Sequence, residues 1–64
     1  MIIRTESGAR VGWVTTDDRE EAEQLADEAA KHAARMVVAG YDFGFQSPGQ
    51  IRENNDGTFT VTTP

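Results

Sequence analysis

The stretch DDREEAEQLADEAAKHAARM, residues 17–36, decides the fold because its apolar residues recur with the period of an α-helix. At about 100° per residue, one side of this helix gathers Ala22, Leu25, Ala26, Ala29, Ala33 and Met36, and the opposite side is charged. An amphipathic helix of this kind buries its apolar side against a second layer. The stripe is mostly alanine, so we expect the helix to lie close against that layer.

Both ends of the helix carry sequence signals. Asp17 followed three residues later by Glu20 predicts a capping box with Asp17 at the N-cap. Gly40 is suited to the region just after the C-terminus. We therefore expect the helix to begin after Asp17 and to end between Arg35 and Val38.

Short runs of strand-forming residues flank the helix. Residues 2–5 and 10–15 are separated by the turn-forming ESGA, which predicts a hairpin. Residues 50–54 and 58–63 are separated by NDG, another turn signal. The resulting order is β-β-α-β-β.

One domain covering residues 1–64 is expected, with an α+β fold. We predict a two-layer sandwich in which the helix packs on a mostly antiparallel sheet of four or five strands. Residues 58–62, TFTVT, are similar to the last strand of the immunoglobulin-binding domains of streptococcal protein G. The resemblance implies a β-grasp-like topology and no function.

The segment YDFGFQSPG, residues 41–49, places Tyr41, Phe43 and Phe45 at alternate positions. A period of two predicts a strand with the three rings on its core side, followed by a turn at SPG. A chain of 64 residues needs such rings inside, because its stability is expected to be only roughly 3 to 10 kcal/mol. The alternative is an exposed platform on which a ligand stacks.

The composition excludes several classes of protein. There is no cysteine, which excludes disulfides and thiolate metal sites, and no apolar run approaches the ~20 residues of a membrane span. No signal peptide is visible. We expect a cytoplasmic protein that does not associate with membranes.

The residues needed for catalysis are sparse. The chain has a single histidine, His32, and its serines, Ser7 and Ser47, fall in predicted turns. No spacing brings a nucleophile, a base and an acid together. Carboxylates on one helix cannot supply the six to eight converging oxygens of a tight calcium site. We expect no enzyme, no cofactor and no metal site.

Charge is the most informative local feature. Residues 17–28 hold seven acids and one base, a net charge of −6, and the rest of the chain has a net charge of +1, which gives the total of −5. One interpretation is a solvated helix face. The functional hypothesis is a docking surface for a basic partner, such as the surface of a nucleic-acid-binding protein that this protein would inhibit or regulate. Its residues are Asp17, Asp18, Glu20, Glu23, Asp27 and Glu28.

Two further binding modes remain open. Trp13 or Tyr41 could anchor a partner on the sheet face away from the helix, and exposed sheet edges favour strand addition or a homodimer. The alternative function is a small-ligand or single-stranded nucleic-acid binder that stacks its ligand on Tyr41, Phe43 and Phe45. GYDFGFQ resembles the aromatic strand of RNA-recognition motifs, but it lacks their basic residue. Because the chain is acidic, direct binding of nucleic acid is not expected.

Overall fold

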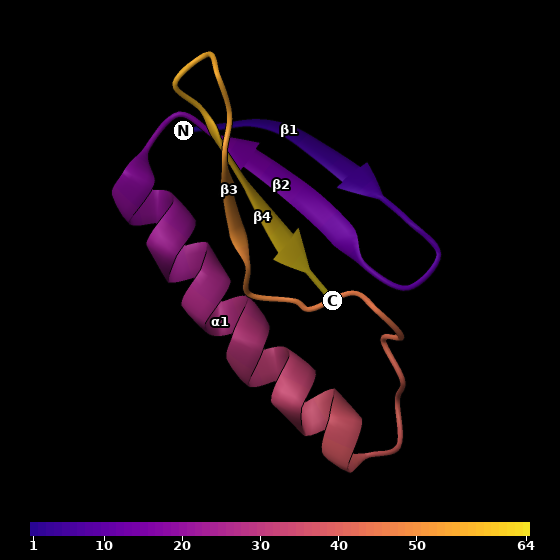
Figure 1. Cartoon of the computed structure of the whole chain (residues 1–64). Helices are drawn as coiled ribbons and strands as arrows, with labels where there is room; N and C mark the ends of the chain where they lie inside the picture. The colour runs from indigo at the N-terminus through magenta and orange to yellow at the C-terminus, as the bar shows by residue number, and fades with distance from the viewer.

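One long helix lies across one face of a four-stranded sheet (Figure 1). The structure, a computed structural model, describes residues 1–64. The expected α+β class and the order β-β-α-β-β are confirmed. The elements are β1 (Ile2–Ser7), β2 (Gly12–Thr16), α1 (Arg19–Val38), β3 (Ile51–Glu53) and β4 (Phe59–Thr63).

The sheet has the strand order β1-β2-β4-β3, and every neighbouring pair is antiparallel. Two hairpins, β1–β2 and β3–β4, are therefore joined through the pairing of β2 with β4. β1 lies at one edge and pairs only with β2. The β-grasp-like topology that the TFTVT resemblance implies is not confirmed.

The register assigns residues to the two faces of the sheet. Val14 lies opposite Val61, and Thr16 lies opposite Phe59. Val61 is fully buried against α1, so this set faces the helix. The intervening residues, among them Trp13, face the other side, which α1 does not cover.

The helix packs on the sheet through its alanines, as the sequence predicts. Ala22 and Ala26 contact Val61, and Leu25 and Phe59 flank that cluster. α1 packs mainly on β4, reaches β2 and β3, and does not contact β1. No helix of this protein has the length and apolar character needed to cross a membrane.

A second small cluster lies under the C-terminal half of the helix. Val11, Ala33 and Phe43 are buried together, and Trp13 and Met36 pack against them. Phe43 comes from the segment after the helix. This segment therefore covers the core beside the C-terminal half of α1.

The helix begins one residue later than predicted. Asp18, not Asp17, is the N-cap, and its carboxylate accepts a hydrogen bond from the Glu20 backbone N–H at 2.9 Å. Asp17 instead forms an ion pair with the amino terminus.

At its other end, α1 terminates at Val38, at the limit of the predicted range. Gly40 has φ +101°, and its N–H donates to the Val37 carbonyl, while the Tyr41 N–H donates to the Met36 carbonyl. These two bonds form a Schellman motif, in which the position of Gly40 favours glycine.

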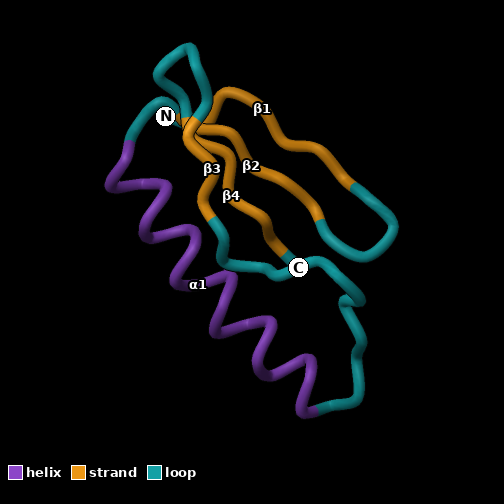
Figure 2. Tube along the Cα trace, viewed as in Figure 1, coloured by secondary structure: helices purple, strands orange, loops and turns teal.

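The predicted strand over residues 41–46 is wrong. Residues 39–50 form a loop that returns along the end of β4 before β3 (Figure 2). Asp42 accepts a hydrogen bond from the Gly44 N–H at 2.8 Å, and Gly44 has φ +67°. This turn breaks the alternation of the rings, so Phe43 is buried whereas Phe45 is fully exposed.

Candidate functional site

The acidic surface predicted from the sequence lies on the solvent side of the first half of α1 and on the two residues before it. All six predicted acids are exposed. Glu20, Glu23 and Asp27 lie at successive turns of the helix, and Glu28 borders them. Asp17 and Asp18 continue the surface at the helix start.

Three of these six carboxylates already have partners within the molecule. Asp17 forms an ion pair with the amino terminus at 2.9 Å, and Asp27 forms one with Lys31 at 3.0 Å. Asp18 caps the helix. The other three carboxylates, those of Glu20, Glu23 and Glu28, make no ion pair and no side-chain hydrogen bond.

Arg19 is the only base between residues 17 and 28, and it is turned away from this surface. Its guanidinium pairs with Glu53 of β3 at 3.2 Å and lies 5.0 Å from the centre of the Phe59 ring. Arg19 therefore compensates a charge on the sheet and contributes a cation–π contact. It neutralises no carboxylate on the outer helix face, where Glu20, Glu23 and Glu28 form no ion pair.

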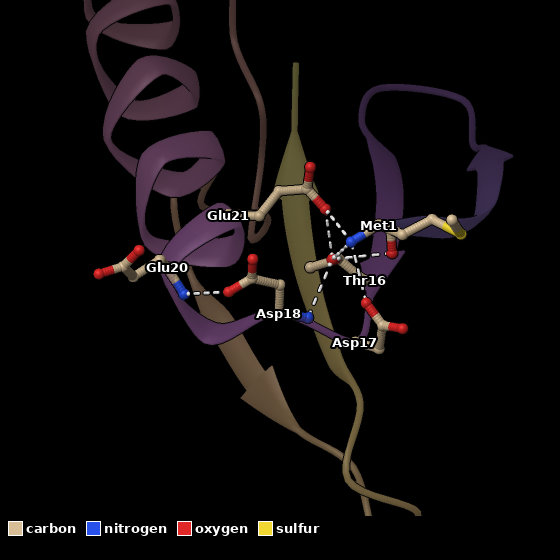
Figure 3. A network of polar contacts seen from close by, with 6 residues as sticks. All are labelled: Met1, Thr16, Asp17, Asp18, Glu20 and Glu21. Carbon is tan, nitrogen blue, oxygen red and sulfur yellow. Dashed lines mark hydrogen bonds and ion pairs between the residues drawn. The ribbon is translucent and has the colours of Figure 1, made fainter.

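Thr16 and Glu21 organise the start of the helix, and neither was predicted as a site residue (Figure 3). The fully buried Thr16 hydroxyl accepts a hydrogen bond from the Asp18 N–H at 3.2 Å. It also lies within donating reach of the Glu21 carboxylate and the Met1 carbonyl, and it can donate to one of them at a time. Glu21 stands three residues after the true cap, Asp18, so the capping-box spacing shifted by one residue could have indicated it.

The amino terminus lies between two carboxylates of this network. Its nitrogen is 2.9 Å from an oxygen of Asp17 and 2.9 Å from an oxygen of Glu21. Hydrogen bonds to Asp17 and Glu21 raise the pKa of the Met1 α-amine from 8.0 to about 10. The pKa of Asp17 is lowered by its hydrogen bond from the amine, and that of Glu21 by hydrogen bonds from Thr16 and the amine.

These pKa shifts predict that the free energy of unfolding decreases both at acidic and at alkaline pH. The amine has a higher pKa in the folded state, so its contribution is complete below about pH 8 and is lost as the pH rises through about 10. The two carboxylates have lower pKa values in the folded state, so their contributions are lost as the pH falls below about 4. The urea concentration at the unfolding midpoint should therefore fall at both acidic and alkaline pH. In an Nα-acetylated chain the fall at alkaline pH should be smaller. An equal fall at alkaline pH in both chains would contradict a role for the amine.

The two predicted aromatic anchors are in different surroundings. Trp13 lies on the open sheet face but is half-buried against the Val11, Ala33 and Phe43 cluster. Tyr41 keeps 40% of its surface exposed, and its ring centre lies 4.6 Å from that of Phe43. The structure does not bring either ring together with the acidic surface.

The open sheet face is less exposed than its position suggests. The hydroxyls of Thr15 and Thr60 share a buried hydrogen bond at 3.1 Å. The Asn54 side chain donates to Thr60 at 2.9 Å and covers it. The centre of this face, around Thr15 and Thr60, is therefore a packed polar layer, whereas Arg4 and Glu6 at its β1 edge are exposed.

His32 lies in an open depression beside the last residues of the chain, together with Glu28 and Arg35. No three histidine, aspartate or glutamate side chains lie close enough together to hold a metal ion.

Comparison with models of known protein families, with curated proteins and with solved structures found no match for this chain.

Proposed function

We propose that the protein is a non-catalytic, cytoplasmic interaction module that docks the acidic outer face of α1 on a basic surface of a partner protein. The observation that carries the proposal is the orientation of Arg19. Because this base pairs with Glu53 and Phe59, the carboxylates of its helix neighbours Glu20 and Glu23 remain exposed and unpaired. Glu28, further along the same face, is also exposed and forms no ion pair.

Electrostatics supports a role in association. An exposed row of like charges produces a field that steers an oppositely charged partner and raises the association rate. Lys31 and Arg35 lie on the same side of the helix further along, so the field is strongest at the N-terminal half of α1. A partner with lysines and arginines along one surface, such as a nucleic-acid-binding protein that this module inhibits or regulates, would match it.

The rigidity of the helix also supports docking. α1 is fixed by its N-cap at Asp18, by the Schellman motif at Gly40 and by alanine packing on Val61. A surface held in place in this way loses little conformational entropy on binding. Asp17 and Asp27 would contribute through their charge while keeping their partners within the molecule.

The aromatic alternative has weaker support. A stacking platform needs several exposed ring faces, and Phe43 is 6% exposed. Only Tyr41 and Phe45 would be available to a small ligand or a single-stranded nucleic acid, and no strand aligns them.

The dependence of binding on salt tests the proposal. The tagged protein is used to capture its partner from a lysate of its own source at about 0.05 M and about 1 M NaCl, which changes the screening length from roughly 14 Å to 3 Å. We expect one stoichiometric partner with a basic surface that is retained at low salt and released at high salt. A partner retained equally at both concentrations, or none at either, would contradict electrostatic docking.

A further inference from the structure

The free edge of β1 is the feature that the proposed docking leaves unexplained. β1 pairs only with β2, and all six of its residues are exposed. Neither α1 nor any strand other than β2 contacts β1, and Figure 1 shows β1 as the border of the sheet beyond β2. An unprotected edge presents backbone donors and acceptors to any strand that can pair with it.

The register shows which backbone groups point outward. The Gly8 N–H donates to the Val11 carbonyl, and Glu6 lies opposite Trp13. In an antiparallel ladder the residues that bond to the partner strand alternate. Glu6 and Arg4 therefore bond to β2, while the N–H and C=O of Thr5 and Ser7 point to the free edge.

We propose that β1 pairs with β1 of a second copy of this chain, antiparallel and with the two-fold axis at Thr5. In this register Thr5 of each copy donates to and accepts from Thr5 of the other. Arg4 of each copy lies directly opposite Glu6 of the other copy, so the two-fold axis produces this contact twice. The proposal is independent of the docking function.

The charges of β1 select this register over its neighbours. An axis at Arg4 would place two arginines opposite each other, and an axis at Glu6 would place two glutamates opposite each other. An axis at Ser7 would run into the turn after β1, and an axis at Ile3 falls at the irregularity between Ile2 and Arg4. Only the axis at Thr5 pairs opposite charges within the regular part of the strand.

The resulting dimer is a continuous eight-stranded antiparallel sheet. A two-fold axis perpendicular to the sheet leaves both α1 helices on the same side. Arg4 and Glu6 already lie 2.9 Å apart within one copy, on one face of the strand, so the four side chains form a ring of alternating charge. The contact is one short strand pair, so we expect a weak dimer that forms at high concentration.

Sedimentation and amide hydrogen exchange of the full chain at about 10 µM and about 1 mM test this proposal. The average mass should rise from 7.0 kDa toward twice that value. The Thr5 amide should become protected only at the higher concentration, whereas those of Arg4 and Glu6 should be protected at both. A mass that stays at one chain, or a dimer in which the Thr5 amide stays unprotected, would overturn the proposal.

Two sets of variants separate edge pairing from other contacts. Thr5→Pro removes the outward N–H without removing a bond to β2, and an edge strand accepts proline there. Thr5→Pro should weaken dimerisation about 30-fold through the loss of two symmetric hydrogen bonds, whereas the control Thr5→Val retains the N–H and should dimerise like the unchanged chain.

Charge exchange tests the register. Arg4→Glu and Glu6→Arg should each weaken the dimer by placing like charges opposite each other, and the double exchange should restore it. Circular dichroism confirms that each variant is folded. A dimer that tolerates both single changes, or one that the double exchange does not restore, would exclude this register.

Discussion

Replacing Ala22 with leucine is expected to lower the free energy of unfolding by about 2 to 3 kcal/mol. Ala22 and Val61 are both fully buried and belong to one cluster where α1 crosses β4. Three additional carbon atoms have no space there, so the helix must move away from the sheet or strain its neighbours. For a domain whose total stability is roughly 3 to 10 kcal/mol, this is a large fraction.

Ala34 provides the matched control for this substitution. It lies on the same helix and is exposed, so Ala34→Leu changes helix propensity in the same way without entering the core. We expect a change of less than about 0.5 kcal/mol. Urea titration of both variants measures the difference, and equal effects of the two substitutions would show that close alanine packing does not hold the helix.

Neutralising the three unpaired carboxylates should weaken partner binding by about ten- to a hundredfold. The variant is Glu20→Gln, Glu23→Gln and Glu28→Gln, and each change removes one charge from the outer face of α1. Each exposed charge pair in a complex contributes about 0.5 to 1 kcal/mol, so three of them account for this range. None of the three is an N-cap or an ion-pair partner, so we expect the fold to be unaffected.

A second triple variant with the same net charge as the glutamine variant separates the effect of where the charges lie from the effect of the total charge. Ser47→Lys, Gln50→Lys and Asn55→Lys add three positive charges at exposed sites outside α1. Both triple variants change the net charge from −5 to −5 + 3 = −2. If binding depends on the acidic face, the lysine variant should lose much less affinity than the glutamine variant. Equal losses would mean that only the total charge matters.

The helix and the two hairpins could be predicted because their signals are local. The alanine period fixed the buried side of α1, and the turns ESGA and NDG located the two hairpins. The pairing of β2 with β4 joins segments separated by more than forty residues. No local pattern encodes that choice, and the resemblance of TFTVT to another sheet implied a topology that the structure does not confirm.

The aromatic segment shows where an alternating pattern misleads. Tyr41, Phe43 and Phe45 have the period of a strand, but Asp42 forms a turn with Gly44, which needs a positive φ. Turn-forming residues within the run therefore outweighed the alternation of the rings. The burial of Phe43 alone depends on Val11 and Ala33, which are distant in the sequence.

The exposure of the acidic surface could be predicted from the sequence, but which of its carboxylates form ion pairs could not. Helical spacing placed Glu20, Glu23 and Glu28 on the solvent side. The partner of Arg19 is Glu53, thirty-four residues away, and the amino terminus takes up Asp17. Which carboxylates stay free therefore depends on tertiary contacts.

Mapping the interface by NMR on the isotopically labelled protein, titrated with its captured partner, tests the docking proposal most directly. We expect the largest amide shift changes and intensity losses at residues 18–28, with the changes abolished at about 1 M NaCl. Changes centred instead on the open sheet face around Trp13, or on residues 41–45, would contradict docking through the acidic face of α1.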